Sequence, residues 1–541
     1  MANPTVEETR TQLKKAVEEQ NFQAFDAAYG AFLSPYDLYQ QQRGDGDLAF
    51  TNPIFGQAGS HRLTTTPQDQ AVPILARARA ASSVLAEMPV QERKELLQAV
   101  QKRIAARAAE IETTITADTG KPIKLARGEM TKGDAWFDWA YANADGQIGK
   151  LNDRRKPMGA VQVIGAYNYP YALAIGGIVG GIAGGNGVIV SAPLKAPHWV
   201  FPFMQAAQEG LDDFIKQKGI QGGNAIALKA GLFQASFGIN ETLTREVDVV
   251  HFVGSDTVGR RIETMRPGKR TILEMGGTNV VTVLNSAVNT TVQNPKDKSK
   301  TVYMTPEWIA ESIYGGFGPA SGQRCTAPRI LCVQKGRAEQ VVSRLAEICR
   351  RDFHAHKLGN PFDDKTEMGP LVDRETFEAM KTAMARAESL GAKVSHAETW
   401  PPNPNEFPLS GKAYWATPVM IDWSNVPAEK MGEAYTLMQH EIFGPLLHVV
   451  KPVETIQQAV AFTNEMDHVN RLAGSVYSQY ASDADYFQDA THVTSMKHNE
   501  PPKDMSPEQY HGHPDRLRIG GGTHFELYTQ GPIVQQGQRF S

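Results

Sequence analysis

The stretch that decides the fold is Val249-Val250-His251-Phe252-Val253-Gly254-Ser255-Asp256-Thr257-Val258-Gly259. Its apolar half predicts a buried strand, and its second half predicts a turn that opens a helix at Arg260. Glycines let the backbone approach a ligand closely, and the free N–H groups of a helix N-terminus favour phosphate. Because the spacing is not the usual GxGxxG, a nucleotide-binding turn and an ordinary tight turn are equally good interpretations of this stretch alone.

Strands and helices alternate on both sides of this stretch. Upstream, apolar runs at 160–165, 188–190 and 225–228 predict strands with helices between them. Downstream, a second alternating set covers 329–476. Alternation of this kind is typical of a parallel sheet with helices on both faces. We therefore predict the α/β class, with a doubly wound, Rossmann-type sheet and a second α/β domain.

The segments outside this alternation are more polar. Residues 5–20 and 22–32 predict two helices at the N-terminus. Residues 40–60 predict a connector or docking arm rather than a core, and 286–307 predict an exposed loop insertion. The C-terminal end is rich in Gly, Pro, His and Gln, which favours an arm over a packed core.

Composition excludes several classes of protein. With 541 residues, 41% of them hydrophobic, the chain can bury large cores in more than one domain. Charged residues of mixed sign make up 21%, and a net charge of -4 gives no electrostatic basis for binding nucleic acid or an anionic membrane. Three cysteines cannot form a disulfide framework, and the polar, acidic N-terminus resembles neither a signal peptide nor a transit peptide. We therefore expect a cytoplasmic protein.

One uncharged stretch, 171–194, has the length and the paired glycines of a transmembrane helix. However, Asn186-Gly187 divides it into a helix and a short strand, so neither half can span a bilayer. We interpret it as a buried helix-to-strand unit and expect no membrane association.

A cysteine among small and polar residues is the first candidate for chemistry. Cys325 lies in Ser321-Gly322-Gln323-Arg324-Cys325-Thr326-Ala327-Pro328, between a flexible approach and a predicted strand. A nucleophile needs that placement, exposed to substrate and supported by packing behind it. Unreactive cysteines are common in folded interiors, so this segment taken alone favours an inert thiol.

Two further residues suit a reactive thiol. Glu274, in Leu273-Glu274-Met275-Gly276-Gly277, places a carboxylate among apolar residues, which suits a general base; a glutamate at a strand end is the plainer interpretation. Asn168, in Ala166-Tyr167-Asn168-Tyr169-Pro170, can direct an amide N–H into a cleft and stabilise an oxyanion; a simple turn asparagine is the alternative.

Together these segments resemble the aldehyde dehydrogenase superfamily over residues 65–480. Six ordered motifs carry the resemblance: 166–170, 254–259, 273–277, 322–327, Met368-Gly369-Pro370 and Glu441-Ile442-Phe443-Gly444-Pro445. The resemblance implies an NAD(P)-dependent enzyme with a catalytic cysteine. Its fold would join a Rossmann-type cofactor domain to an α/β catalytic domain and an oligomerisation arm.

The resemblance also implies domain boundaries. They are an N-terminal helical extension (1–60), a cofactor-binding domain (61–273) with an oligomerisation segment near 144–159, a catalytic domain (274–490) and a C-terminal arm that makes subunit contacts (491–541). The partner would be a small-molecule aldehyde, bound by a homodimer or homotetramer.

The roles of individual residues follow from the same resemblance. Cys325 would be the nucleophile, Asn168 and the Cys325 backbone N–H the oxyanion donors, and Glu274 the base. An aldehyde would be oxidised to a carboxylic acid through a thiohemiacetal and a thioester. NADP or NAD would be held by Ile164, Ser191, Lys195, Gly254, Ser255, Gly259, Glu441 and Phe443.

Two segments depart from the family pattern. Where the family usually carries Lys-Pro-Ser-Glu, this chain has Ser191-Ala192-Pro193-Leu194. The carboxylate of the family's Glu, which would repel a 2′-phosphate, is absent here. The neighbouring Lys195 would attract a 2′-phosphate, so these residues favour NADP. The C-terminal arm lacks the usual Pro-Phe-Gly-Gly and offers His511 and His513 instead, but loop histidines need no metal, so we predict no metal site.

The 286–307 insertion lengthens the link between Glu274 and Cys325. It would contact a large substrate or a neighbouring subunit, or it is a passive surface loop. With the Gly520-Gly521-Gly522 tail, it resembles the family branch that acts on semialdehydes of ring-cleavage acyl-CoA compounds.

Three alternatives are a CoA-acylating or reductive aldehyde dehydrogenase, a non-catalytic structural protein on the same scaffold, and a cysteine hydrolase. Glu274 favours hydrolysis over transfer of the acyl group to CoA. An idle scaffold has no physical need for Cys325, Glu274 and Asn168 together. A cysteine hydrolase needs a histidine beside the thiol and would not use a nucleotide-binding turn.

Overall fold

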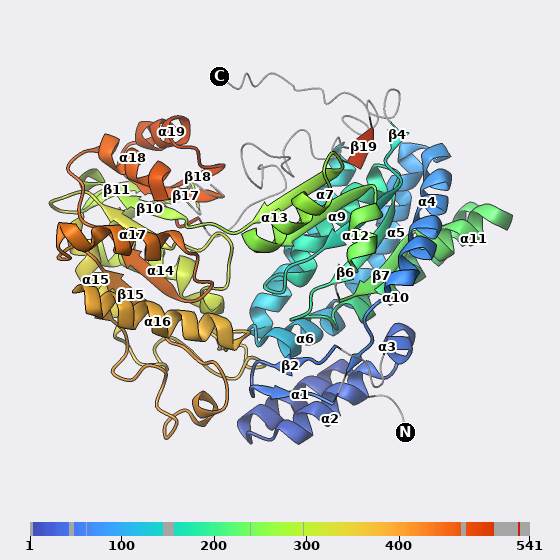
Figure 1. Cartoon of the computed structure of the whole chain (residues 1–541), viewed down its shortest axis with the longest axis horizontal. Coiled ribbons are helices and arrows are strands. Elements are labelled where there is room, and N and C mark those ends of the chain that lie inside the picture. Colours follow the sequence, from blue (N-terminus) through green and yellow to red (C-terminus); the bar gives the residue numbers. More distant parts are fainter. Residues whose placement is uncertain are drawn as a thin grey trace.

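The computed structural model describes residues 4–42, 48–60, 62–143, 156–238, 240–295, 297–466, 472–502 and 528–530. Two sheets organise these residues into two lobes that face each other (Figure 1). His511, His513, Gly520–Gly522 and most of the predicted oligomerisation segment lie outside the described residues.

A five-stranded parallel sheet forms the first lobe, in the order β7-β6-β5-β8-β9. The strands are β5 (Ala160–Ile164), β6 (Gly187–Ala192), β7 (Phe233–Phe237), β8 (Val249–Gly254) and β9 (Arg270–Met275). The chain winds outward from β5 in both directions, so the strand order reverses between β5 and β8. Ligands of such sheets bind in the crevice beyond the carboxyl ends of the strands at that point. The predicted doubly wound fold is confirmed.

Helices cover both faces of this sheet (Figure 1). The helices of this lobe are α4 (Ala71–Glu87), α5 (Val90–Ala106), α6 (Ala108–Thr119), α7 (Ile123–Asn143), α9 (Pro170–Ala183), α10 (Val200–Lys218), α11 (Gly222–Gly231), α12 (Glu241–Glu246) and α13 (Asp256–Met265). Within one strand the side chains alternate between two cores: Val188 and Val190 of β6 join one, and Ile189 joins the other. That alternation is the period-2 pattern of a sheet buried on both faces.

A seven-stranded sheet forms the second lobe, in the order β14-β15-β16-β13-β10-β17-β18. Its strands are β10 (Val280–Val283), β13 (Ile330–Val333), β14 (Lys393–Ser395), β15 (Val419–Asp422), β16 (Leu446–Val449), β17 (Ala473–Tyr477) and β18 (Ser495–His498), of which only β14 is antiparallel to its neighbour. The helices of this lobe are α14 (Pro306–Phe317), α15 (Glu339–Cys349), α16 (Arg374–Leu390), α17 (Met431–Gln439), α18 (Ile456–Met466) and α19 (Ala481–Ala490). Cys332 and Cys349 are fully buried in the cores of this lobe.

The strand predicted at 225–228 is wrong, because these residues belong to α11. Ile226 is 69% exposed, whereas Leu228 is buried, so the apolar run marks a helix lying on α4 rather than a strand. The strand that follows is β7, which was not predicted because the polar Gln234 interrupts its apolar pattern. That buried side chain donates to the Ile74 carbonyl at 2.8 Å and accepts from Arg77 at 3.0 Å, which satisfies a polar residue inside the sheet.

The N-terminal extension packs into the core of the first lobe. It contains α1 (Val6–Glu18), α2 (Phe22–Leu33), α3 (Asp37–Gln42) and a short hairpin of β2 (Thr51–Asn52) and β3 (Gln57–Ala58). The interpretation of 40–60 as an arm rather than a core is wrong, because Phe50, Ile54 and Phe55 are buried. The Tyr29 hydroxyl also donates to the buried Asp118 carboxylate at 2.7 Å, tying α2 to α6.

The 286–307 insertion is an antiparallel hairpin of β11 (Thr290–Gln293) and β12 (Thr301–Met304), not a loop. The sheets also cross two predicted boundaries: β9 continues to Met275, past residue 273, and β18 lies beyond residue 490. Near the C-terminus, β19 (Thr529–Gln530) pairs with β4 (Lys156–Pro157). Among the described helices, none combines the length and apolar character needed to cross a bilayer.

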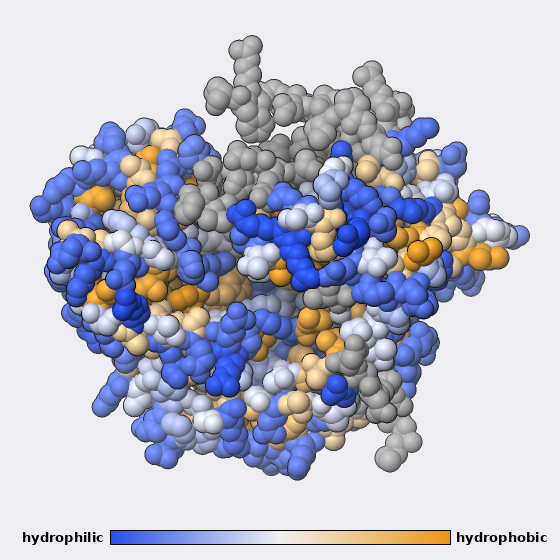
Figure 2. Space-filling model, viewed as in Figure 1, coloured by the Kyte–Doolittle hydropathy of each residue, from blue (hydrophilic) through white to orange (hydrophobic). Residues whose placement is uncertain are grey.

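Between the two lobes the surface is hollowed, and apolar side chains gather at that hollow (Figure 2). The outer surface of the second lobe is mostly hydrophilic in the same view. The hollow is the entrance to the cleft that the candidate site occupies.

Candidate active site

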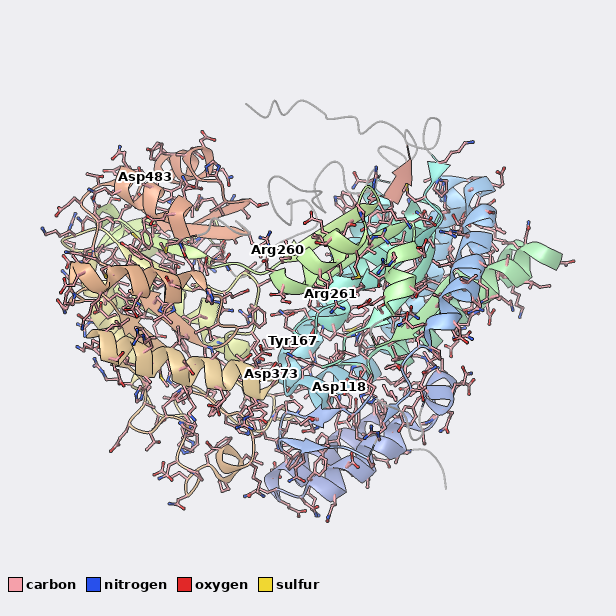
Figure 3. The ribbon with its side chains drawn as sticks, viewed as in Figure 1. Asp118, Tyr167, Arg260, Arg261, Asp373 and Asp483 are labelled. Atoms are coloured by element: carbon pink, nitrogen blue, oxygen red, sulfur yellow. The ribbon has the colours of Figure 1, made fainter. Side chains whose placement is uncertain are left out.

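A cleft of about 1050 Å³ opens where the carboxyl ends of β5, β6 and β8 meet the second lobe. Figure 3 shows Tyr167 and Asp373, two of its lining residues, at the junction of the lobes. The predicted site residues that line it are Ile164, Asn168, Ser191, Lys195, Gly254, Ser255, Glu274, Cys325, Glu441 and Phe443. Gly259 is the exception: it lies behind the cleft wall, where a Cβ would meet the Met275 sulfur at 2.5 Å.

Cys325, the candidate nucleophile, follows a turn of unusual backbone geometry. Ala320, Ser321 and Gly322, which we name the nucleophile turn, have φ values of 56°, 53° and 66°. Left-handed backbone costs energy at a non-glycine residue, so neighbours must hold it. The Ser321 hydroxyl donates to the Gly369 carbonyl at 2.6 Å, and a Cβ on Gly322 would lie 2.3 Å from the Gly444 carbonyl oxygen. The motifs around 369 and 444 therefore support the turn that precedes Cys325.

Two residues missed by the sequence analysis fix the same segment. The buried Arg329 guanidinium donates to the carbonyls of Gly322 at 2.9 Å, Arg324 at 3.1 Å and Gly444 at 2.7 Å. The Asn279 amide donates to the Cys325 carbonyl at 2.7 Å. Each residue lies two positions after a recognised motif, and that proximity is the only signal for them in the sequence.

Asn168 is buried and held from the nucleophile segment. Its Nδ2 donates to the Gln323 carbonyl at 3.1 Å, and the Gln323 side chain accepts from the Val372 N–H at 3.0 Å. An amide nitrogen carries two N–H groups, so one can orient Asn168 while the other serves an oxyanion. The structure thus brings Asn168 and Cys325 to the same wall of the cleft.

The thiol of Cys325 is strongly disfavoured from ionising. Burial raises its pKa to about 12, and the negative charges of Glu274 and Glu441 add to the effect, while Lys132 opposes it. Because the thiolate is the nucleophile, a base must remove the proton before the sulfur can react. Glu274 is a carboxylate of the same cleft and is close enough to act electrostatically on the thiol.

A histidine of the fold-deciding stretch lies behind Glu274. His251, fully buried in β8, places Nε2 3.6 Å from the Glu274 carboxylate and Nδ1 2.7 Å from the Tyr528 hydroxyl. Space for the ring comes from Gly177 of α9, where a Cβ would meet Nδ1 at 2.5 Å. Tyr528 is itself anchored, because its carbonyl accepts from Asn186 at 2.9 Å. The His251 ring therefore lies between Tyr528 of the C-terminal segment and Glu274, the candidate base.

The crevice fits a dinucleotide. Ser255 caps α13, whose first-turn N–H groups favour phosphate. Gly254 has no room for a side chain, because a Cβ there would meet the Phe252 ring at 2.5 Å. On the facing wall, Glu441 Oε1 is buried without a hydrogen-bond partner among the described residues. Burial raises the Glu441 pKa to about 7, although Arg329 and the Gly277 N–H lower it. Arg329 lies 3.7 Å from Oε1 without a hydrogen bond, so this oxygen is free to accept from ribose hydroxyls.

The adenosine end of the crevice contains an unexpected ion pair. Lys195 pairs with Asp373, the N-cap residue of α16, and so joins the two lobes. The Ser191 hydroxyl accepts from Gln162 at 2.9 Å. Lys195, predicted to attract a 2′-phosphate, is therefore neutralised by a carboxylate that the sequence analysis did not anticipate.

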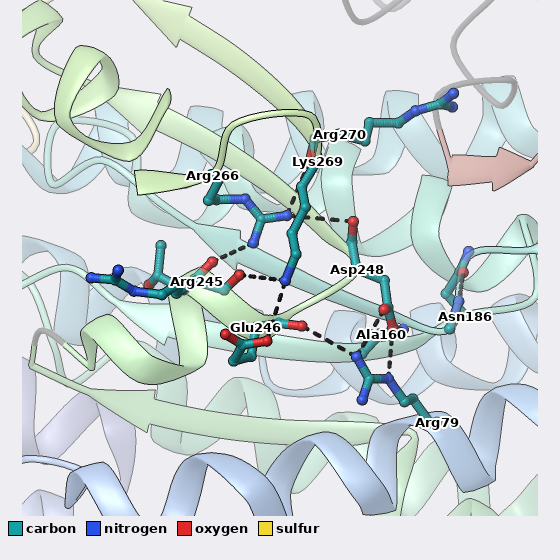
Figure 4. A network of polar contacts seen from close by, with 11 residues as sticks. Arg79, Ala160, Asn186, Arg245, Glu246, Asp248, Arg266, Lys269 and Arg270 are labelled. Atoms are coloured by element: carbon teal, nitrogen blue, oxygen red, sulfur yellow. Dashed lines mark hydrogen bonds and ion pairs between the residues drawn. The ribbon is translucent and has the colours of Figure 1, made fainter. Parts of the chain in front are cut away.

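The far end of β8 is fixed by an ionic network (Figure 4). Asp248 pairs with Arg79 of α4 at 2.8 Å and accepts from the Ala160 N–H at 2.8 Å, which joins β8 to β5. Arg266 donates to the Asp248 carbonyl at 3.4 Å from the opposite side. These contacts hold the amino ends of β5 and β8 in register, and the carboxyl ends of the same strands face the cleft.

Comparison with known proteins agrees with this geometry. The sequence profile of the aldehyde dehydrogenase family matches residues 39–514. The chain is 28% identical over 406 residues to N-succinylglutamate 5-semialdehyde dehydrogenase of Novosphingobium aromaticivorans, covering 72% of this chain and 76% of that protein.

Solved structures show the same fold. Indole-3-acetaldehyde dehydrogenase of P. syringae, in complex with NAD+, has a TM-score of 0.71 at 20% identity and covers 89% of this chain and 92% of its own. Glyceraldehyde-3-phosphate dehydrogenase of Methanocaldococcus jannaschii, complexed with NADP, has a TM-score of 0.71 at 19% identity. The match covers 90% of this chain and 98% of that structure's chain. The predicted resemblance is confirmed: the chain belongs to the aldehyde dehydrogenase family of NAD(P)-dependent oxidoreductases.

Proposed function

We propose that this protein oxidises an aldehyde to a carboxylic acid by covalent catalysis at Cys325. The supporting observation is the convergence of Cys325, Asn168 and Glu274 on one cleft that continues into the nucleotide crevice. A nucleophile, an oxyanion donor and a base are the groups that acyl chemistry requires.

In the first half of the reaction the Cys325 sulfur, once deprotonated, bonds to the aldehyde carbon. The carbonyl oxygen becomes the alkoxide of a thiohemiacetal, and the Asn168 amide stabilises its charge. A nicotinamide cofactor, when bound, supplies the acceptor for the hydride that this carbon loses. The product on Cys325 is a thioester.

In the second half Glu274 accepts a proton from water while the water oxygen attacks the thioester carbonyl. Collapse of the tetrahedral adduct breaks the carbon–sulfur bond, releases the carboxylic acid and returns the sulfur as a thiolate.

The same proposal includes the roles of the two domains and the oligomeric state. Residues 61–273 would bind NADP or NAD and 274–490 would hold the nucleophile. We expect a homodimer or homotetramer, with the segment near 144–159 and the 491–541 arm at the subunit contacts. Light scattering coupled to size-exclusion chromatography measures the mass and therefore tests the assembly.

A panel of aldehydes assayed separately with NAD and NADP tests the reaction. We expect a carboxylic acid that carries oxygen from isotopically labelled water, and no turnover by Cys325→Ala. The matched control is Cys332→Val, which replaces a buried core thiol by a side chain of similar size and should keep the activity. A thioester product that appears only with free CoA would instead identify an acylating enzyme, and full activity of Cys325→Ala would refute the mechanism.

A further inference from the structure

The adenosine end of the crevice has a second ion pair, which joins α12 to α13. Arg261 of α13 pairs with Glu241, the first residue of α12, and both side chains line the cleft. Arg261 extends from α13 toward the cleft (Figure 3). The neighbouring Arg260 differs, because it pairs at 2.6 Å with Asp256 of its own helix and does not line the cleft.

The position of this pair along the crevice matches the base of a dinucleotide. A cofactor with its nicotinamide near Cys325 and its pyrophosphate at the start of α13, capped by Ser255, extends its adenosine over β6 and β7. Glu241 follows β7 in the chain, whereas Lys195 follows β6, the strand next to the central β5. The pair therefore belongs to the outer end of the crevice, where the adenine ring must lie.

Exposed apolar side chains border the same end. Leu194, which follows β6, is 43% exposed, and Val258 of α13 is 45% exposed. Both line the cleft, whereas the other exposed large hydrophobic side chains of the described residues do not. A flat purine ring would cover apolar surface of this kind. We name Leu194 and Val258 the apolar slot.

The ion pair lies beside the apolar slot. The residues of α13 that line the cleft beyond its first turn share one side of the helix, since they are three or four positions apart: Val258, Arg261, Ile262 and Met265. Because Arg261 contacts Glu241, the slot has a guanidinium and a carboxylate next to each other at its polar border.

The pair is fixed at its base and available to a ligand at its tip. Asn240 caps α12 by accepting from the Leu243 N–H at 2.9 Å, and it donates to the Pro67 carbonyl at 2.9 Å, which holds the start of the helix. The side chains of Arg261 and Glu241 are 60% and 40% exposed. An ion pair this exposed contributes little to stability, so its polar atoms can also bind a ligand at small cost.

We propose that the ion pair of Glu241 and Arg261 recognises the edge of the adenine base. Glu241 accepts from the 6-amino group, and Arg261 donates to an adjacent ring nitrogen. Adenine presents a donor beside an acceptor along this edge, and the pair presents an acceptor beside a donor. The inference deepens the cofactor binding of the proposed function and rests on it. The identity of the base, and not only the charge of the phosphates, then determines which dinucleotide the protein binds.

Nicotinamide hypoxanthine dinucleotide isolates this contact, because it carries an oxygen where NAD carries the 6-amino group. That oxygen cannot donate to Glu241 and is repelled by its charge. We expect NAD to bind about 10-fold more tightly than the analogue in calorimetric titrations without aldehyde. Equal affinities for the two dinucleotides would overturn the inference.

Variants of the carboxylate assign the preference to one residue. Glu241→Gln should reduce the ratio of the two affinities to about 1, since an amide can accept from an amino group or donate to an oxygen. The matched control is Arg260→Gln, which removes a charge from α13 outside the cleft lining and should keep the wild-type ratio. A wild-type ratio in Glu241→Gln would place the preference on another residue and overturn the assignment.

Arg261→Gln separates recognition of the base from binding of a 2′-phosphate. If the guanidinium donates to the ring, the variant should bind NAD and NADP more weakly by a similar factor of about 3- to 10-fold. A loss of affinity confined to NADP would place the guanidinium on the 2′-phosphate and contradict its role at the base.

These titrations contain no aldehyde, so they do not depend on chemistry at Cys325. If NAD is preferred through Glu241 while Cys325→Ala still oxidises aldehydes, the proposed function fails and the recognition of adenine stands. If oxidation requires Cys325 but NAD and the hypoxanthine analogue bind equally, the proposed function stands and the recognition of adenine fails.

Discussion

The imidazole Nε2 of His251 lies 3.6 Å from the Glu274 carboxylate, inside the first lobe and away from the nucleophile. The ring cannot turn away easily, because Tyr528 contacts its other nitrogen and α9 packs against it at Gly177. Glu274 is thus oriented from behind by a residue that does not itself line the cleft. His251 is a positioning residue in the proposed mechanism.

His251→Leu should slow hydrolysis of the thioester more than its formation, because Glu274 loses its orienting contact. We expect steady-state kcat to fall by about 10-fold, with the initial burst of reduced cofactor retained. Rapid-mixing absorbance at the reduced-cofactor band measures both quantities. Tyr528→Phe keeps the ring and should have a smaller effect. Loss of the burst in proportion to kcat would contradict the positioning role.

The thiol of Cys325 should become more acidic when neighbouring negative charge is removed. Burial raises its pKa to about 12, with Glu274 as the next cause. Since alkylation requires the thiolate, Glu274→Gln should increase the rate of iodoacetamide labelling at pH 8 by about 3- to 10-fold. Glu375→Gln, which lines the cleft but is not among the causes of the shift, is the control. An unchanged rate in Glu274→Gln would show that the carboxylate does not act on the thiol.

Cofactor binding should depend on pH through Glu441. Burial raises the pKa of this carboxyl to about 7, so it is protonated below that pH and ionised above it. If the ionised form accepts from the ribose, affinity should rise by up to about 10-fold between pH 6 and pH 8. Fluorescence titration with NAD and NADP measures the affinity at each pH. Glu441→Gln should be weaker and independent of pH; persistence of the slope in that variant would place its origin elsewhere.

The ion pair between Lys195 and Asp373 should control the choice between NADP and NAD. Asp373→Asn releases Lys195 while keeping a side chain that can cap α16 through the Thr376 N–H. We expect the ratio of kcat/KM for NADP to that for NAD to rise by about 3- to 10-fold in this variant and to fall in Lys195→Gln. Equal ratios in all three proteins would exclude Lys195 as a phosphate contact.

The N-terminal extension should stabilise the first lobe through Tyr29. Its hydroxyl donates to Asp118, which also accepts from the His198 ring at 2.7 Å and the His198 N–H at 2.9 Å (Figure 3 shows Asp118). Tyr29→Phe leaves this buried carboxylate one donor short and should lower the free energy of unfolding by about 1–3 kcal/mol. Urea denaturation followed by fluorescence measures the loss. Tyr480→Phe, at a position 56% exposed, should change little.

Local pattern was enough to predict the elements that bury a continuous apolar face. The predicted helices at 5–20 and 22–32 match α1 and α2 to within two residues, and the predicted strand at 160–165 ends one residue beyond β5. Pattern failed where a polar residue is satisfied by a distant partner, as Gln234 is in β7, or where a loop-like composition forms a hairpin, as at β11 and β12. In both cases the deciding contacts are not local.

The candidate site divides in the same way. Cys325, Glu274 and Asn168 were predicted because their motifs are short and continuous, and the structure places all three on the cleft. The residues that hold these three in place were not predicted, because their contacts join distant segments of the chain. His251 contacts Tyr528, 277 positions away, and Arg329 contacts Gly444, 115 positions away. No local rule predicts which distant carbonyl or hydroxyl a side chain will reach.

The left-handed backbone of the nucleophile turn has a consequence for the timing of synthesis. Its three residues are held by the carbonyl of Gly369 and by close packing on Gly444, both encoded well downstream of Cys325. A nascent chain therefore carries the thiol long before it carries the residues that shape the turn. The turn can acquire its supported geometry only after Gly444 has been synthesised, so chains released before that point would lack the support for Cys325.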